Sequence, residues 1–214
     1  MHSMKITLLV DNPRSWYASY AQTLQKSLSN YNHKVFLVHD VHDITEGDLA
    51  FFLSCETIIK KDIRDKNTLS LVVHSSSLPK GKGWSPLTWQ ILEGKNDVTN
   101  TLFEAVDRVD AGQIFMQNSI QFEGYELLPE LHDKQGKCIN ELIEKFVEQY
   151  PNVVAKQQIG EESFYRKRTS EDSELNVNKN IEEQFNLLRI VDNEKYPAFF
   201  CYKGQKYILK IYIQ

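Results

Sequence analysis

Short apolar runs, each ended by polar residues, dominate the first half of the chain. The runs are KITLLV (5–10), KVFLV (34–38), DLAFFLS (48–54) and LSLVVH (69–74). Short, β-branched apolar runs of this kind predict buried strands, and the apolar spacing of residues 14–29 predicts a helix between the first two. Strands separated by helices or loops favour a parallel sheet whose carboxyl edge is open to ligands. We expect His39, Ser54 and His74 to emerge at that edge.

The second half of the chain mixes both periodicities. SPLTWQILEG (85–94) predicts a helix, because Pro86 stands near its start and Gly94 near its end. Residues 100–106 and 113–122 predict strands around an Asp-Ala-Gly turn, and residues 125–150 predict one or two helices that end before Pro151. A polar stretch (156–180) leads to a predicted helix near 181–191. The alternating run AFFCYKGQKYILKIYI (198–213) predicts a β-hairpin around Lys-Gly. We therefore expect an α/β domain over 1–155 and a small appendage over 156–214.

Composition narrows the function classes. The 214 residues carry a net charge of −4, from 25 basic and 29 acidic side chains, which argues against a nucleic-acid partner. No apolar run approaches the roughly 20 residues that span a bilayer, and no signal peptide opens the chain, so no membrane partner is expected. The three cysteines lack CxxC spacing, which favours reduced thiols and a cytoplasmic location.

Several polar clusters could carry chemistry. VHDVHD (38–43) offers His39, Asp40, His42 and Asp43, but a solvated strand end explains it better than a metal site, and we expect no metal. KGKG (80–83) lacks the spacing of a phosphate loop and suits a turn that admits close backbone approach. RKR (166–168) is either a solvated face or a phosphate site. The serines at 75–77 lack the GxSxG frame of a serine hydrolase.

His74 is the strongest single candidate. A histidine at a strand end is commonly structural, but it becomes a candidate base when a carboxylate can orient it. Asp107 and Asp110, in VDRVDAG, follow a predicted strand and could return to the same edge.

These residues resemble the folate-dependent formyltransferases, which include methionyl-tRNA formyltransferase, glycinamide ribonucleotide transformylase and the sugar N-formyltransferases. The family pattern is Asn-x-His, then Leu-Pro, Gly-x-x-Pro and Asp-x-Gly. Here His74, Leu78-Pro79, Gly83, Pro86 and Asp110 fall in register, whereas Val72 stands where the family has asparagine. FYRKRTSEDSEL and the C-terminal segment are similar to enzymes that formylate nucleotide-linked amino sugars. The sequence of the segment LPKGKGWSPLTWQILEGKN (78–96) is similar to a subgroup tied to pseudaminic-acid-type sugars and to the formylation domain of a peptide synthetase.

The resemblance implies a Rossmann-like catalytic domain, N10-formyltetrahydrofolate as formyl donor and a primary amine as acceptor. It implies His74 as general base and Asp110 as its carboxylate. The implied folate-contacting residues are Cys55, Glu56, Ile58, Asp107 and Val109. For the sugar nucleotide we expect Lys82, Trp84, Arg168 and Arg189.

Val72 cannot donate a hydrogen bond to an oxyanion, so the prediction requires a substitute donor or a slow enzyme. Ser75, Ser76, Asn100, Thr101, a backbone N–H or a water are the candidates. The competing readings are methionyl-tRNA formylation, glycinamide ribonucleotide formylation and a non-catalytic binding protein that has decayed at Val72. The alternating hairpin also suggests a homodimer.

Overall fold

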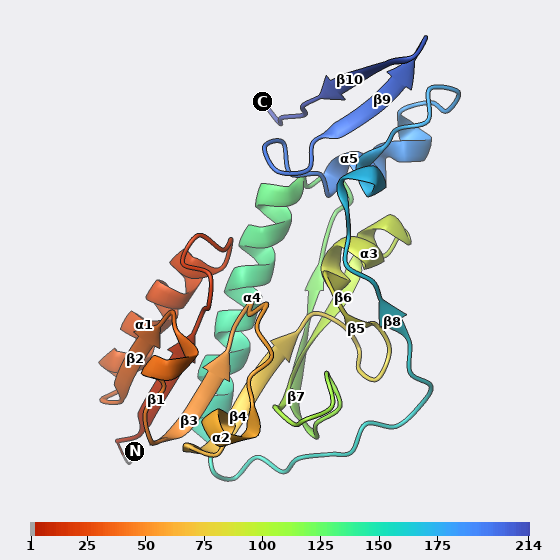
Figure 1. The fold of residues 1–214 in the computed structure, drawn as a ribbon. Coiled ribbons are helices and arrows are strands. Elements are labelled where there is room, and N and C mark those ends of the chain that lie inside the picture. The colour runs from red at the N-terminus through yellow and green to blue at the C-terminus, as the bar shows by residue number, and fades with distance from the viewer. Residues whose placement is uncertain (1–2) are drawn as a thin grey trace.

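A six-stranded sheet forms the centre of the protein in the computed structural model, which describes residues 3–214. Its strand order is β2-β1-β3-β4-β6-β7 (Figure 1). The strands are β1 (Lys5–Leu9), β2 (Lys34–Val38), β3 (Gly47–Phe52), β4 (Asn67–His74), β6 (Asp97–Glu104) and β7 (Ile114–Gln121). The first four run parallel, β6 runs antiparallel to β4, and β7 pairs antiparallel with β6 and so has the direction of the first four. The predicted α/β class with a mostly parallel sheet is confirmed.

Helices α1 (Ala18–Asn30) and α4 (Leu128–Gln149) cover one face of the sheet (Figure 1). The apolar stripe of α4 packs with α1 and β1 into the largest core cluster, in which Leu8, Phe51 and Phe146 are fully buried. Burying such apolar surface is the main stabilising contribution to the fold. The region 125–150 thus holds one long helix, whose first turn contains Pro129 and which ends before Pro151.

A second apolar cluster lies between strands and short segments, and includes Leu9, Ala50, Phe52 and Val72. Because side chains alternate across a strand, His74 is on the same sheet face as Val72, whereas Leu71 faces the cluster beneath α4. The short helix α2 (Lys61–Arg64) adds Ile63 to this side. The face of β4 that carries His74 is therefore opposite to the one that α4 covers.

The chain after α4 runs back along the main body before it reaches the C-terminal unit, residues 169–214 (Figure 1). Lys156 exchanges two backbone hydrogen bonds with Ile114, and β8 (Phe164–Tyr165) pairs in parallel with β5 (Lys82–Gly83). Residues 156–168 thus contact the main domain, although the predicted boundary assigned them to the appendage. The division of the chain at 155 stays a prediction.

The C-terminal unit contains short 3-10 turns (Ser170–Ser173 and Glu182–Gln184), helix α5 (Phe185–Arg189) and the hairpin β9 (Ala198–Tyr202) with β10 (Gln205–Leu209). The β-hairpin predicted for residues 198–213 is confirmed, with strands at Ala198–Tyr202 and Gln205–Leu209. The helix is shorter than the predicted 181–191, because the Gln184 side chain bonds to the preceding loop and a turn begins at Asp192. Helix α3 (Pro86–Leu92) packs against α5.

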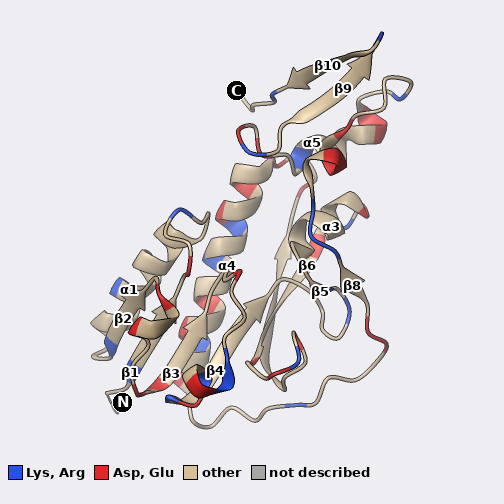
Figure 2. Ribbon diagram, in the orientation of Figure 1, with Lys and Arg blue, Asp and Glu red and all other residues tan. Residues whose placement is uncertain are grey.

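Basic and acidic residues are interspersed along the helices and loops, and one run of basic residues leads upward from β8 (Figure 2). Within the described residues, no helix combines the length and the apolar character needed to cross a bilayer.

Candidate active site

His74 ends β4 and is nearly buried, with 8% of its surface exposed. Its Nε2 lies 2.8 Å from the carbonyl oxygen of Gly81. A carbonyl oxygen can only accept a hydrogen bond, so Nε2 carries the proton in this arrangement. The neutral ring therefore has its basic lone pair on Nδ1, which is the nitrogen able to take up a proton.

Asp110 faces that nitrogen. Its carboxylate oxygen Oδ2 lies 3.8 Å from His74 Nδ1 and accepts a hydrogen bond of 2.8 Å from the backbone N–H of Gly83. Asp110 sits in the left-handed region, at φ 51°, and Gln158 donates to its carbonyl oxygen, which fixes the loop. The structure thus brings together the two residues that the sequence singled out, at a separation longer than a hydrogen bond but short enough for strong charge interaction.

Gly83, whose N–H binds Asp110, also brings this loop into close backbone contact with β8. Its φ is +94°, and a Cβ at this position would lie 2.4 Å from the carbonyl oxygen of Tyr165 in β8. Only glycine tolerates both the conformation and the close approach. The KGKG turn therefore serves backbone contact, as predicted, and its contact partner is a strand about 80 residues away in the chain.

The predicted folate segment follows β3. Asp11 Oδ2 accepts hydrogen bonds from the backbone N–H groups of Glu56 (2.9 Å) and Thr57 (2.8 Å), which orders this turn. Ile58 is 73% exposed and presents an apolar surface. Burial raises the pKa of the Cys55 thiol to about 12, so it stays protonated and acts as a small apolar side chain.

The opposite predicted wall of the folate pocket contains Asp107 and Val109. Val109 is exposed, and Asp107 pairs with the guanidinium of Arg64, which also donates to the carbonyl oxygen of Ile59. Arg64 therefore ties the two predicted walls together, a role that the sequence analysis missed. Two exposed apolar side chains, Ile58 and Val109, lie on the segments that Arg64 holds together.

The residues predicted for the sugar nucleotide divide into exposed and buried groups. Trp84 is 40% exposed, and the Nζ of Lys167 lies 4.4 Å from the centroid of its ring. Lys82 is 1% exposed and its Nζ lies 2.8 Å from Glu162 Oε1, so its charge is already neutralised inside the protein. The predicted contact between Lys82 and a ligand is not supported, because the ammonium does not face solvent.

Arg189 is also a buried structural residue. It is 1% exposed and donates to the carbonyl oxygen of Glu126, to the Glu126 carboxylate and to the side-chain oxygens of Asn96 and Asn186. These bonds join α5 to the loop before α4, and they leave Arg189 unavailable for a diphosphate. Burial alone would raise the pKa of Glu126, but the bonds that Lys134 and backbone N–H groups donate lower the pKa of that carboxyl to about 2.

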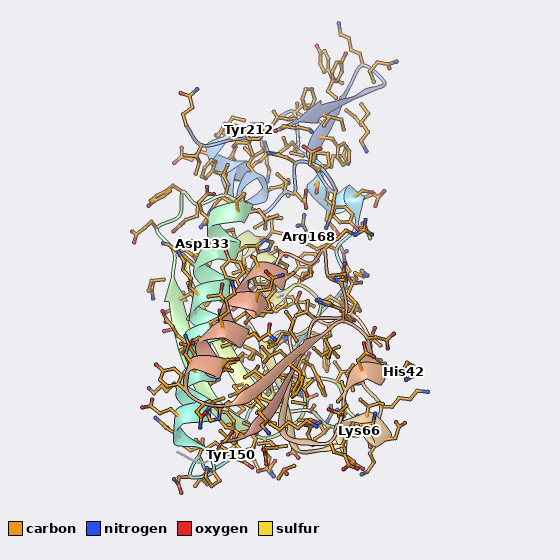
Figure 3. The ribbon with its side chains drawn as sticks, turned by 90° about the vertical axis from the view of Figure 1, so that its left-hand side faces the viewer. His42, Lys66, Asp133, Tyr150, Arg168 and Tyr212 are labelled. Atoms are coloured by element: carbon orange, nitrogen blue, oxygen red, sulfur yellow. The ribbon has the colours of Figure 1, made fainter. Side chains whose placement is uncertain are left out.

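Arg168 lies where the C-terminal unit joins the main body (Figure 3). Its guanidinium donates to the carbonyl oxygens of Ile190 (3.2 Å) and Asp172 (3.4 Å), and burial lowers its pKa. Its donors point into the protein, and the predicted diphosphate contact is not supported for Arg168 either.

Because Val72 stands where the family has asparagine, the sheet face that carries His74 lacks one hydrogen-bond donor. The structure reduces the number of side chains that could supply this donor instead. Ser75 and Asn100 bond to each other at 2.7 Å in a network that extends to α4, on the opposite face of the sheet. Thr101 Oγ1 donates to the carbonyl oxygen of Ser76. The hydroxyl of Ser76 is buried and has no protein partner, so it is the one among the four side chains with an uncommitted proton.

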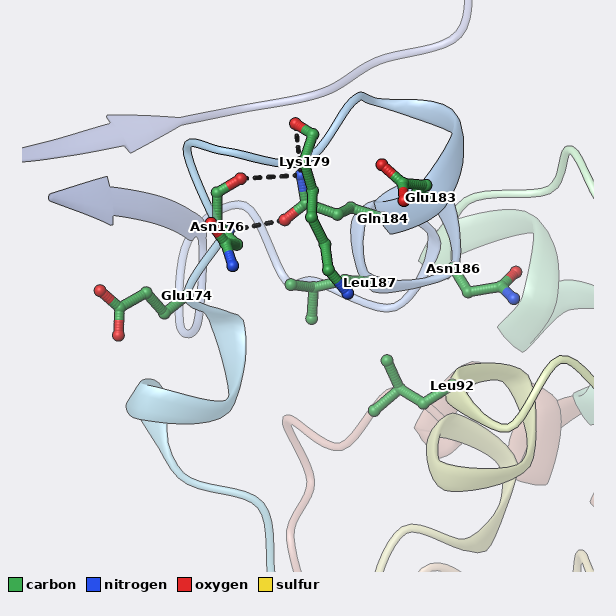
Figure 4. Close-up of a pocket in the computed structure, with 8 residues that line it drawn as sticks. All are labelled: Leu92, Glu174, Asn176, Lys179, Glu183, Gln184, Asn186 and Leu187. Atoms are coloured by element: carbon green, nitrogen blue, oxygen red, sulfur yellow. Dashed lines mark hydrogen bonds between the residues drawn. The ribbon is translucent and has the colours of Figure 1, made fainter. Parts of the chain in front are cut away.

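The VHDVHD cluster borders an open hollow of about 480 Å³, which His42, Lys5 and Lys66 help to line. His39 Nδ1 lies 2.7 Å from the carbonyl oxygen of Val10, and residues 3–214 hold no group of three or more His, Cys, Asp or Glu side chains arranged for a metal ion. A shallow hollow of about 290 Å³ lies in the C-terminal unit between α3 and α5, lined mainly by polar residues such as Asn176, Lys179 and Gln184 (Figure 4). It is separate from the His74 site.

Comparisons with known proteins identify the family and the fold. The sequence profile of the family described as "Formyl transferase" matches residues 17–143. Methionyl-tRNA formyltransferase from Clostridium thermocellum superposes with a TM-score of 0.80 at 23% identity, covering 95% of this chain and 90% of that one. A 4-N formyltransferase from Francisella tularensis gives a TM-score of 0.74 at 18% identity, covering 100% and 99%.

A third similar structure is HypX from Aquifex aeolicus in complex with tetrahydrofolic acid, with a TM-score of 0.76 at 19% identity. This chain is covered over 98% of its length, and the HypX chain over 38%. These likenesses confirm the Rossmann-like formyltransferase fold. Because the family profile covers more than half of its residues, the chain belongs to the formyl transferase family and is a formyltransferase.

Proposed function

We propose that this protein transfers a formyl group from N10-formyltetrahydrofolate to the amino group of a nucleotide-linked amino deoxy sugar. The observation that carries the proposal is the meeting of His74 Nδ1 and Asp110 Oδ2 at 3.8 Å beside the Gly81–Gly83 loop. The separation leaves room for one amine to donate hydrogen bonds to both acceptors, which would orient it for attack.

The reaction needs a base, a partner for the positive charge and stabilisation of an oxyanion. As the amine attacks the formyl carbon, its proton passes to His74 Nδ1, and the Asp110 carboxylate stabilises the imidazolium that forms. The bond between the formyl carbon and N10 then breaks, and His74 returns the proton to N10 as tetrahydrofolate leaves. The Gly81 carbonyl oxygen holds the ring orientation throughout. The folate co-substrate supplies the formyl carbon, and the segment 55–58 together with the loop 107–109 is the proposed place for its ring system.

Similar structures support the two substrate classes. HypX is known with tetrahydrofolic acid bound, and the Francisella protein is a 4-N formyltransferase. A sugar N-formyltransferase from a Shewanella species also shares the fold over the whole chain, with a TM-score of 0.74 at 15% identity. We propose a UDP- or dTDP-linked amino sugar as acceptor on this basis, together with the exposed Trp84 beside the His74 loop.

Methionyl-tRNA is the second candidate acceptor, because the Clostridium enzyme has a similar fold over 90% of its chain. A tRNA ligand calls for an extended basic surface. Here the net charge is −4, and two of the three cations at 166–168 already have partners within the chain, Arg166 in an ion pair with Asp172 and Arg168 on backbone carbonyl oxygens. A decayed, non-catalytic protein is disfavoured because His74 and Asp110 are both present and face each other at 3.8 Å.

A panel assay tests the proposal. The protein is mixed with N10-formyltetrahydrofolate and, separately, with UDP- and dTDP-amino sugars, tRNA charged with methionine and glycinamide ribonucleotide. We expect tetrahydrofolate release and a formylated product with one amino sugar, and none with His74→Ala. Product with tRNA or glycinamide ribonucleotide instead of a sugar would overturn the acceptor class.

The partner of the terminal hairpin is proposed to be a second copy of the chain. Tyr202, Tyr207 and Ile208 are exposed on the hairpin at 53%, 46% and 55%. Tyr202 and Tyr207 lie on one face of the hairpin and Ile208 on the other, and exposed apolar side chains on a two-stranded sheet are typical of protein–protein contacts. Light scattering should give a dimer mass for the wild type and a monomer mass for Ile208→Lys; a wild-type monomer would contradict this.

A further inference from the structure

The basic cluster at 166–168 contains one cation with an exposed partner. Arg166 forms a two-pronged ion pair with Asp172 and stacks on Trp89, and Arg168 is committed to backbone carbonyl oxygens. Lys167, between them, points to the opposite side of the chain and meets Glu56 at 3.2 Å. Both members of this pair are more than half exposed, at 57% and 63%.

Lys167 lies at the rim of the His74 site. Its Nζ is 4.4 Å from the Trp84 ring, and Trp84 directly follows Gly83, whose N–H bonds to Asp110. The backbone N–H of Trp84 donates to the carbonyl oxygen of Tyr165 at 3.1 Å, so strand pairing fixes the position of the segment that carries Lys167. Three distant parts of the chain, at 56, 84 and 167, therefore converge beside the catalytic loop.

The ion pair between Lys167 and Glu56 is of an exchangeable kind. Exposed pairs contribute about 0–1 kcal/mol, because both charges remain hydrated and their flexible side chains must be ordered. The diphosphate of a nucleotide-linked sugar carries two negative charges, one on each phosphate, and is therefore a better acceptor for a lysine ammonium than a single carboxylate. Lys167 can therefore leave Glu56 for an anion at little cost.

We propose that Lys167 binds the diphosphate of the nucleotide-linked substrate and that Glu56 competes with this diphosphate for the same ammonium. The inference rests on the proposed function and makes it specific. It replaces Lys82 and Arg189, which are buried, and Arg168, whose guanidinium donates to backbone carbonyl oxygens, by the middle residue of the RKR cluster that the sequence analysis left open as a phosphate site. Trp84 holds the ammonium by a cation–π contact in both states.

The experiment measures binding and kinetics in four variants. Isothermal titration with UDP and with dTDP as probes gives the affinity of the wild type, Lys167→Met, Glu56→Gln and the double variant. We expect Lys167→Met to weaken binding about tenfold or more, as for the loss of a hydrogen bond to a charged group. Glu56→Gln should tighten binding about two- to fivefold, and this gain should vanish in the Lys167→Met background.

Lys137→Met is the matched control, because Lys137 forms an exposed ion pair with Asp133 on α4, at the other face of the sheet. It should leave the affinity unchanged. In the formyl-transfer assay, Lys167→Met should raise KM for the amino-sugar nucleotide while KM for N10-formyltetrahydrofolate and kcat stay within about twofold.

Two results would overturn the inference: unchanged nucleotide affinity in Lys167→Met, or a rise confined to KM for the folate, which would assign Lys167 to the folate glutamate tail. Failure of the proposed function is a separate outcome. In that case the wild type itself would bind neither UDP nor dTDP and would formylate no amino sugar.

Discussion

Replacing Asp110 with asparagine separates the charge of this side chain from its hydrogen bond. The asparagine oxygen can still accept the Gly83 N–H, which Asp110 Oδ2 accepts at 2.8 Å in the wild type. What disappears is the negative charge 3.8 Å from His74 Nδ1. For a pair with side chains about nine-tenths buried, an effective dielectric of about 20 gives an attraction of about 4 kcal/mol between carboxylate and imidazolium.

That attraction exists only when His74 carries a proton, so it stabilises the transition state more than the bound substrate. A loss of about 4 kcal/mol corresponds to a fall in kcat of about 10³-fold. We expect KM for both substrates to change less than about threefold and the free energy of unfolding to change by less than about 1 kcal/mol.

Steady-state formyl transfer and urea unfolding of Asp110→Asn provide the measurement. Asp107→Asn is the control from the same loop: Asp107 is 80% exposed and pairs with Arg64 instead of His74, so its kcat at saturating folate should stay near the wild-type value, although KM for the folate can rise because Asp107 lies in the proposed folate wall. A kcat for Asp110→Asn within tenfold of the wild type would refute the charge argument. Equal losses in the two variants would show that the loop, rather than the charge, had been disturbed.

Three further changes test other parts of the site. Gly83→Ala should lower the free energy of unfolding by about 2–4 kcal/mol in urea titrations and should reduce kcat. The added Cβ would lie 2.4 Å from the Tyr165 carbonyl oxygen, at a φ of +94°. A variant as stable as the wild type would contradict the contact between Gly83 and β8. Val72→Asn should raise kcat at least about tenfold by restoring an oxyanion donor, whereas an unchanged or lower kcat would point to a donor already present. Glu126→Gln should cost about 3 kcal/mol at pH 7, because the pKa of Glu126 falls from 4.5 to about 2 in the folded protein. This stabilisation is present above pH 4.5 and is lost as the pH falls toward 2, so denaturant titrations of the two proteins should converge in acid; a gap that stays constant down to pH 2 would exclude it.

The strands could be predicted because each is a short, continuous apolar run, and burial on both faces leaves that signature in the local sequence. The pairing of His74 with Asp110 was predicted from a spaced motif, and the structure brings the two together. Asn100 shows the limit of this reasoning. It has a suitable side chain and lies one position from Thr101, yet strand alternation turns it to the α4 face.

The structural roles of Lys82 and Arg189 could not be predicted from the sequence around each residue. Each charge is matched by a carboxylate that lies 80 or 63 residues away in the chain, Glu162 and Glu126 respectively. No composition or periodicity signals such a partner, whereas an unpaired buried charge would be very costly, so the structure needs it. An exposed cation such as Lys167 looks identical to them in the sequence.

The parallel pairing of Gly83 with Tyr165 has a consequence for the evolution of this chain. Recombination that replaced the chain after residue 155 would remove β8, the strand that pairs with β5 in the loop beside His74 and Asp110. The reaction centre would lose its outer support even though His74 and Asp110 were both retained. The segment after residue 155 and the Gly81–Gly83 loop are therefore expected to change together in evolution. A new acceptor preference should need paired substitutions in both segments and should not arise from exchange of the C-terminal segment alone.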